Sequence, residues 1–216
     1  MNRRFHRGFL AIALSALVPA AALMSAACGD SSDSENGNGN DLEPPAECAL
    51  AVPPDGWVYP AGPYGTELDD TFADLTLDDC AGDSVVFGDV LGQSELTLFS
   101  IGAGWCEPCV DETKTLDAEI FRQFCGRGLR VVQALFQDGE GNPATKLFCS
   151  EWRREFSLSF PVVVDPLFEL QDHFQSVDSQ TPINYLIDRT GRIVFKSTGI
   201  PPADLPQRID SLLPAQ

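Results

Sequence analysis

The sequence is poor in histidine and in basic residues. Only two of its 216 residues are His and 14 are Lys or Arg, against 32 Asp or Glu. Three of the basic residues, Arg3, Arg4 and Arg7, lie in the first 27 positions, which leaves 11 in the rest of the chain and a net charge there of about −21. Because nucleic acids and anionic membranes are bound through Lys and Arg, this balance argues against a nucleic-acid partner. The acidity itself is adequately explained as a means of solubility.

Clusters of metal ligands are lacking as well. A structural zinc site needs four Cys or His ligands at suitable spacing. The chain has one close cysteine pair, Cys106 and Cys109, and a single histidine, His173, beyond the first 27 residues. We therefore expect no metal, and expect His173 to belong to a short helix. No internal repeat is present, which argues against a solenoid.

The N-terminus has the pattern of a secretory signal. Basic residues precede an apolar stretch, Phe9–Ala22, and small residues follow at Ser25–Ala27. A retained membrane anchor is the alternative, but it needs about 20 apolar residues, and Phe9–Ala27 only just reaches that length with Pro19 inside it. Seven cysteines also favour an oxidising compartment. We predict that the first 27 residues are a signal peptide and that the protein is exported.

Cys28 stands directly after the small residues. The segment resembles a bacterial lipoprotein signal, in which this cysteine is lipidated after cleavage, although Ser25 occupies the position of the expected Leu and Leu23 lies two places earlier. Lipidation would leave six cysteines, an even number, for pairing. We predict a lipid anchor at Cys28 that holds the domain at a bacterial membrane, in the periplasm or on the outer surface. Cleavage by the ordinary signal peptidase is the alternative.

Three regions follow from composition. Residues 1–27 form the signal, and residues 28–64 form a flexible tether and a Pro-rich lead-in. The tether prediction rests on Gly29–Asn40, which has no apolar residue to bury. The lead-in contains Pro53–Pro60 with two aromatic residues and is expected to pack against the domain. Residues 65–216 form one domain.

The domain alternates between strand-like and helix-like patterns. Short apolar runs predict strands, and apolar residues at helical spacing predict helices. The expected strands are Thr71–Leu77, Val85–Phe87, Leu96–Ile101, Leu129–Phe136, Val162–Val164, Ile183–Asp188 and Ile193–Lys196, and the expected helices are Val110–Phe124, Pro143–Phe156 and Pro202–Leu213. This order predicts an α/β domain with a central mixed sheet, helices on both faces and an N-terminal β-hairpin.

The sequence Cys106-Glu-Pro-Cys109 lies where a buried strand gives way to a helix. Unpaired N–H groups and the helix dipole stabilise a thiolate at a helix N-terminus, so Cys106 is the predicted nucleophile. Cys109, one turn further, is placed to attack the mixed disulfide and release the substrate. A purely structural bridge is the alternative, but it would close a very short loop and stabilise little.

Several separated segments together resemble the thioredoxin superfamily, and within it the TlpA/ResA-like thiol-disulfide oxidoreductases with a redoxin, or AhpC/TSA-like, domain. These segments are Phe72–Leu75, Leu98–Cys109, Phe160–Pro166 and Thr181–Ile193. The resemblance covers about Asp69 to Leu213 and implies a thioredoxin fold. It also implies that Pro182 is a cis-proline facing the dithiol, that the backbone of Thr181 pairs with an extended substrate, and that Trp105 is the aromatic residue beside the dithiol. A trans proline at a strand start and a core tryptophan are the plainer interpretations.

The residues that could transfer protons near the dithiol differ from those of thioredoxin itself. Ser100 stands where thioredoxin has a buried acid, and a hydroxyl cannot replace that base. Glu112 matches a glutamate that ResA-like proteins have near the active site, and its spacing puts it on the helix face of Cys109. Two interpretations stay open, a catalytic carboxyl and a solvated helix glutamate.

Four further cysteines, Cys48, Cys80, Cys125 and Cys149, allow three connectivities. Cys125 follows the first helix, and Cys149 lies in a helix expected on the opposite face, so a bridge between these two would exceed the permitted Cα separation of about 7 Å. We favour a structural disulfide between Cys48 and Cys80.

The leading hypothesis is an envelope enzyme that exchanges disulfides with protein substrates and with an upstream electron donor or acceptor. Its own dithiol serves as the redox group, so no separate cofactor is expected. The acidic residues of the chain, including Glu107 between the two cysteines, favour a reductase over an oxidase. A peroxiredoxin-type thiol peroxidase is one alternative, but the Pro-x-x-x-Thr-x-x-Cys loop of that class is absent. A Sco-type copper chaperone is the other, but the cysteine spacing is wrong for it.

Overall fold

A computed structural model describes residues 43–174 and 180–215. The predicted signal peptide, the lipidation site at Cys28 and most of the tether lie outside these residues. All described residues belong to one compact unit, Gly37–Gln216. No helix within them is long and apolar enough to cross a membrane.

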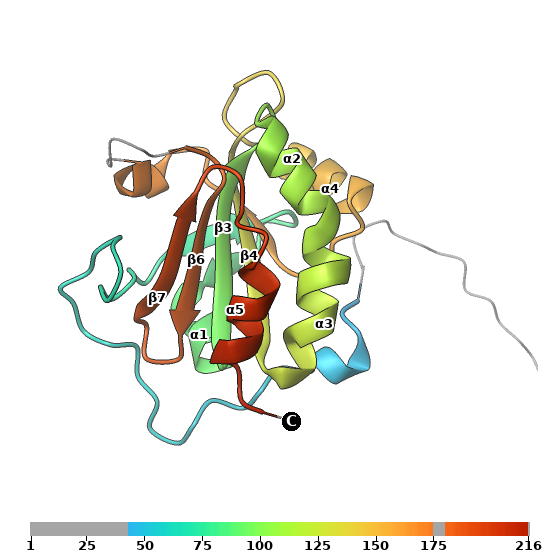
Figure 1. Ribbon diagram of the computed structural model, residues 1–216. Coiled ribbons are helices and arrows are strands. Elements are labelled where there is room, and N and C mark those ends of the chain that lie inside the picture. Colours follow the sequence, from blue (N-terminus) through green and yellow to red (C-terminus); the bar gives the residue numbers. More distant parts are fainter. Residues whose placement is uncertain (1–42, 175–179, 216) are drawn as a thin grey trace, which may run out of the picture. The chain divides into compact units, whose positions relative to one another are not determined.

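The core is a seven-stranded mixed sheet (Figure 1). Its strands are β1 (Thr76–Asp79), β2 (Ser84–Val86), β3 (Leu96–Ala103), β4 (Leu129–Gln137), β5 (Val162–Val164), β6 (Ile183–Asp188) and β7 (Ile193–Thr198). They lie in the order β2-β1-β5-β4-β3-β6-β7. The strands β3, β4 and β5 are parallel, and the pairs β1–β2, β1–β5, β3–β6 and β6–β7 are antiparallel. The predicted mixed sheet and its N-terminal hairpin are confirmed.

The central strands are buried on both faces. Every residue of β3 is buried, and so is every residue of β4 except the last. Strands covered on both sides are nearly continuous apolar runs, because neither set of alternating side chains reaches water. This is why Leu96–Ile101 and Leu129–Phe136 could be predicted from composition.

One long helical segment follows β3. It consists of α2 (Glu107–Thr115), a π-helical stretch (Leu116–Phe121), α3 (Arg122–Phe124) and a final 3-10 turn (Cys125–Arg127). Gly128 ends it with a φ of 95°, a conformation that glycine adopts without strain. The expected helix over 110–124 is confirmed and begins three residues earlier.

The other helices are α1 (Phe87–Gly92), α4 (Lys146–Glu155) and α5 (Leu205–Leu212). Helix α4 begins later than expected because Thr145 caps it, its hydroxyl accepting from the Phe148 N–H at 3.1 Å. Helix α1 was not expected. A 3-10 helix, Glu169–Phe174, contains His173 and confirms the short helix predicted there.

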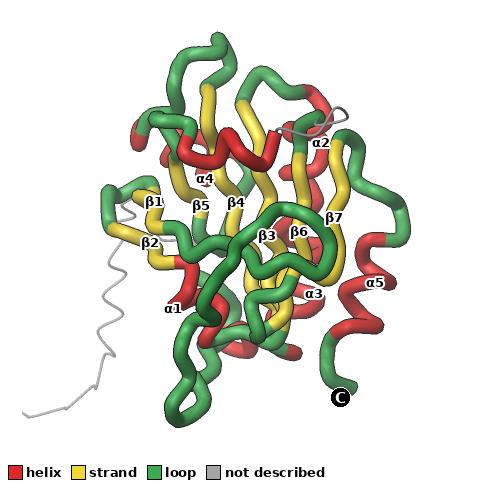
Figure 2. The backbone as a smooth tube through the Cα atoms, turned by 90° about the vertical axis from the view of Figure 1, so that its left-hand side faces the viewer, coloured by secondary structure: helices red, strands yellow, loops and turns green. Residues whose placement is uncertain are grey.

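Helices cover both faces of the sheet. Side chains of α2, α3, α4 and α5 share one buried cluster with Leu98, Leu129 and Val164. A second cluster on the other face joins α1 and Leu170 to Phe99 and Tyr185. Figure 1 shows α3 and α5 beside the sheet. In Figure 2, which is turned by 90° from that view, loops drawn in green pass in front of the strands.

The expectation that α4 covers the face opposite the first helix is wrong. The chain steps in one direction across the sheet, from β3 to β4 to β5, with a helix in each parallel crossover. Right-handed crossovers that step the same way place their helices on the same face.

The lead-in packs against the domain. A 3-10 helix, Ala46–Cys48, carries a buried cysteine. The Tyr59 hydroxyl donates to the backbone oxygen of Phe72 at 2.7 Å. The Trp57 ring packs against Gly92, and a Cβ added to Gly92 would lie 3.0 Å from ring carbons of Trp57.

The predicted pairing of Cys48 with Cys80 is wrong. Cys48 is bonded to Cys125, and Cys80 is bonded to Cys149. The 3-10 helix Ala46–Cys48 of the lead-in contacts the 3-10 turn Cys125–Arg127, which brings Cys48 to Cys125. Strand β1 pairs with β5 beside α4, which brings the β1–β2 turn to Cys149. Both contacts arise from tertiary packing between distant segments.

Candidate functional site

The dithiol lies at the start of α2, directly after β3. Cys106 and Cys109 form a disulfide with their Cα atoms 5.2 Å apart. Cys106 is the N-cap of α2, and the Cys109 N–H donates to its sulfur at 3.2 Å. Pro108 falls in the first turn, where its missing N–H costs no helical hydrogen bond. The helix start therefore directs a backbone donor at Cys106, an arrangement that favours a thiolate after reduction.

The two sulfur positions differ in access. Both are buried, Cys109 completely and Cys106 with 3 % of its surface exposed, but only Cys106 lines an open groove of about 500 Å³. The groove is lined by Trp105, Cys106, Glu107, Pro108, Phe136, Phe168, Gln180 and Thr181. A substrate in this groove would meet Cys106 and not Cys109.

Trp105 forms part of the groove wall. Its side chain is half exposed, so its interpretation as a core residue is wrong. The indole N–H donates to the Gln137 side-chain oxygen at 2.9 Å, and the ring packs edge-on against Phe136. These two contacts hold an apolar surface beside the dithiol.

Thr181 and Pro182 come from the segment before β6. Their peptide bond is cis, which agrees with the geometry that the resemblance implies. Pro182 is buried, and its oxygen accepts from the Gly199 N–H at 2.9 Å. Thr181 is partly exposed and lines the groove that contains Cys106. Residues 75 positions apart in the sequence thus meet at one site.

Glu112 is buried, with 7 % of its surface exposed, so the solvated interpretation is wrong. Its carboxylate accepts from the Asn184 amide at 2.7 Å and from the Ser100 hydroxyl at 3.2 Å. Burial raises the pKa of Glu112 to about 7, against the opposing effect of these two hydrogen bonds. A carboxyl with this pKa can both take and release a proton at neutral pH.

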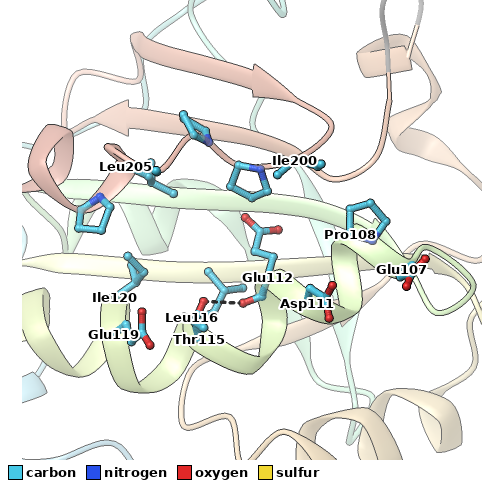
Figure 3. A pocket seen from close by; sticks show the side chains of 14 residues that line it. Glu107, Pro108, Asp111, Glu112, Thr115, Leu116, Glu119, Ile120, Ile200 and Leu205 are labelled. Atoms are coloured by element: carbon cyan, nitrogen blue, oxygen red, sulfur yellow. Dashed lines mark hydrogen bonds between the residues drawn. The ribbon is translucent and has the colours of Figure 1, made fainter.

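A second cavity, of about 490 Å³, adjoins Glu112 (Figure 3). In Figure 3 the Glu112 side chain points away from its helix toward the wall that carries Ile200 and Leu205. Glu107, Asp111 and Glu119 also line this cavity. Glu107 and Pro108 border both hollows, so the cavity beside Glu112 adjoins the groove at Cys106.

A row of buried polar side chains crosses the sheet beneath the dithiol helix. Asn184, Ser100 and Gln133 are adjacent in register on β6, β3 and β4. The Gln133 amide donates to the Thr113 hydroxyl, which donates to the Cys109 backbone oxygen, each at 2.7 Å. Sequence analysis missed Asn184, Gln133 and Thr113. For Asn184 and Gln133 the signal was a polar residue within an otherwise apolar strand, since buried polar groups need partners. Thr113 lies on α2 and had no such signal.

Gly102 was also missed. It lies at the end of β3, where a Cβ would sit 3.2 Å from both Cβ and Sγ of Cys109. The absence of a side chain lets the strand approach the second sulfur closely.

No group of three or more His, Cys, Asp or Glu side chains gathers into a metal-binding cluster within the described ranges. His173 is buried, its Nδ1 lies 3.1 Å from the Tyr185 hydroxyl, and burial lowers its pKa to about 4. Its ring is therefore a packed part of the core.

The fold is that of the thioredoxin superfamily. The AhpC/TSA family model matches residues 68–196, and the chain belongs to that family. No curated protein matches the sequence.

Solved structures give the same fold at low identity. A putative thiol:disulfide interchange protein DsbE from Chlorobium tepidum is 20 % identical, with a TM-score of 0.55, over 68 % of this chain and 96 % of its own. A putative protein disulfide isomerase from Bacteroides thetaiotaomicron is 19 % identical, with a TM-score of 0.58, over 69 % and 92 %. Peroxidoxin BcpB from Mycobacterium tuberculosis is 13 % identical, with a TM-score of 0.55, over 68 % and 97 %. At these identities the likeness establishes the fold alone.

Proposed function

We propose that this protein is an exported thiol-disulfide oxidoreductase that acts on protein substrates through Cys106 and Cys109. The observation that carries the proposal is the asymmetry of the pair. Cys106 caps a helix and lines the groove with 3 % of its surface exposed, while Cys109 is fully buried, outside that lining, on the helix face of Glu112, three residues further on.

In the reducing direction the Cys106 thiolate attacks a substrate disulfide. A bond forms between Cys106 and one substrate sulfur, the substrate disulfide breaks, and the released thiolate takes a proton. The Cys109 thiol then gives its proton to Glu112 and attacks Cys106. The second substrate thiol leaves, two electrons have passed to the substrate, and the Cys106–Cys109 disulfide has formed. An upstream dithiol must reduce it for another cycle.

The neighbouring residues have distinct roles in this proposal. Trp105 offers an apolar surface to the substrate, and the backbone beside Pro182 offers hydrogen bonds at Thr181. Asn184 and Ser100 position the Glu112 carboxyl. The dithiol is the redox group, and no other cofactor is required.

We place the protein in the cell envelope, held by a lipid on Cys28, and working in the reducing direction. Negative charge near the attacking sulfur, such as that of Glu107, disfavours the thiolate and so favours the disulfide form of the pair. A reduction potential near the thioredoxin value of about −270 mV would support this direction, and one near the DsbA value of about −120 mV would contradict it.

Trapping tests the main proposal. The Cys109→Ala variant should accumulate a mixed disulfide between Cys106 and a protein partner, identifiable by mass after non-reducing separation. The Cys106→Ala, Cys109→Ala double variant is the matched control and should trap nothing. Equal trapping by both variants, or reduced Cys106 that does not react with a thiol reagent, would contradict the proposal.

Peroxide reduction is a second candidate, because the family and the peroxidoxin likeness include this fold. It predicts that the reduced protein consumes hydrogen peroxide in a reaction lost with Cys106→Ala. Exchange with a protein disulfide and no peroxide consumption would reject this candidate.

A further inference from the structure

A third cavity lies at the end of the sheet away from the dithiol. Arg130 at its wall is the second residue of β4, whereas the dithiol follows the last residue of the parallel strand β3. The cavity has a volume of about 620 Å³, within the range of small-molecule sites. The lead-in, α1, the β1–β2 hairpin and the start of β5 form its walls. Most of its lining is apolar and includes Ala46, Val85, Val90, Val131 and Val162.

Arg130 is the buried cation of this cavity. Only 5 % of its surface is exposed. Its terminal nitrogens donate to the backbone oxygens of Ala49 at 2.7 Å and Leu129 at 2.9 Å, with a longer contact of 3.5 Å to Cys125. Within residues 43–174 and 180–215 no carboxylate pairs with it, and its buried Nε–H has no acceptor.

This arrangement is electrostatically incomplete. A guanidinium stays charged in proteins, and a buried charge is costly unless an opposite charge or a full set of hydrogen bonds compensates it. Backbone oxygens satisfy part of Arg130 but supply no negative charge. Burial lowers the pKa of the Arg130 guanidinium, the direction expected where no anion balances it.

The other charged side chains of the cavity do not supply the negative charge that Arg130 lacks. Asp79 accepts from the backbone N–H groups of the β1–β2 turn, and Asp89 is exposed on α1. Arg153 adds a second cation, with its Nε donating to the Leu158 oxygen at 3.1 Å. Of these four charged side chains in the lining, Arg130 alone is buried.

We propose that this cavity binds an aliphatic monocarboxylate, whose carboxylate pairs with Arg130 and whose apolar chain lies among the valines. The apolar lining excludes a small hydrated anion as the preferred ligand, and the buried cation excludes a neutral hydrocarbon. The site is independent of the dithiol, so disulfide exchange is not needed for binding.

A titration of the purified protein followed by amide NMR tests this proposal with three probes, octanoate, 1-octanol and acetate. Octanoate should give saturable shifts clustered at Ala46, Val90 and Val131, while octanol and acetate should bind at least about tenfold more weakly, because each lacks one of the two contacts. Arg130→Met should weaken octanoate binding by about tenfold or more. Arg208→Met, on α5, is the matched control and should leave it unchanged.

If Arg130→Met does not fold, Ala46→Trp provides the second test, since Ala46 is exposed and lines the cavity. A larger side chain there should block octanoate without removing the cation. The proposal is overturned if the wild-type protein shows no saturable octanoate shifts, if octanol binds as well as octanoate, or if neither variant weakens binding. In that case Arg130 serves only to clamp the lead-in to β4.

Discussion

The Asn184 side-chain amide on β6 donates to the Glu112 carboxylate on α2, with 2.7 Å between Nδ2 and Oε1. This bond links the sheet to the dithiol helix, 72 residues away in sequence. Asn184 stabilises the charged form of a carboxyl that burial would otherwise keep protonated. The balance between these two effects sets the proton affinity beside Cys109.

Glu112 should make stability depend on pH. Its pKa is about 7 in the folded protein and 4.5 when unperturbed. Between these values the unfolded chain releases a proton that the folded protein keeps, so the contribution of Glu112 to stability is present below pH 4.5 and is lost as pH rises through 7. This loss amounts to about 3 kcal/mol.

Urea unfolding of the wild type and of Glu112→Gln at several pH values measures this effect as the difference between their free energies of unfolding. His173 acts in the opposite direction, because its pKa is lowered to about 4 and its burial favours folding as pH rises toward 6.5. The stability of the wild type relative to Glu112→Gln should therefore fall between pH 4.5 and 8. A difference that stays constant over this range would show that Glu112 does not titrate there.

Glu112→Gln should also slow disulfide exchange at pH 7 by about tenfold or more, because glutamine cannot accept the Cys109 proton. Single-turnover reduction of a protein disulfide measures this rate. Formation of the mixed disulfide at Cys106 should be less affected than its resolution. Unchanged resolution would remove Glu112 from the mechanism.

Asn184→Leu should raise the pKa of Glu112 further, since the carboxylate loses its shorter hydrogen bond. Ser100→Ala removes the longer bond, at 3.2 Å, and should raise the pKa less. Carbon NMR of labelled glutamate follows the carboxyl directly and does not depend on activity. Equal effects of the two substitutions would show that bond length does not determine the contribution.

Gly102→Ala should destabilise the protein by about 1–3 kcal/mol, because the added methyl group would lie 3.2 Å from the Cys109 sulfur. The matched control is Gly139→Ala, where nothing lies within 4 Å of the added carbon. Thermal unfolding compares the two variants. Similar melting temperatures would mean that β3 and α2 can separate at little cost.

The lead-in disulfide should be a major source of stability. The Cys48–Cys125 bridge spans 77 residues, for which chain entropy predicts about 4 kcal/mol. Replacing both cysteines with serine should lower the unfolding free energy by an amount of this order. Peptide mapping under non-reducing conditions should recover Cys48 with Cys125 and Cys80 with Cys149, and any other pairing would contradict the fold of the lead-in.

Sequence alone determined the features that local chemistry encodes. The long apolar runs of β3 and β4 predicted buried strands, and the helical spacing after Cys109 predicted the long helix. The position of Cys106 between them predicted a cysteine at a helix N-terminus, and Cys106 is the N-cap of α2. Each of these depends on residues that are neighbours in the chain.

Only the tertiary structure decided what distant segments do to one another. Whether Glu112 was solvated or buried depended on Ser100 and Asn184, which approach it from two strands. The partners of Cys48 and Cys80 depended on where the lead-in and the hairpin pack. Helix α4 lies on the same face of the sheet as α2 because of the order in which the strands join the sheet. Burial, pKa and disulfide geometry are properties of distances in space, and the order of residues along a chain does not specify those distances locally.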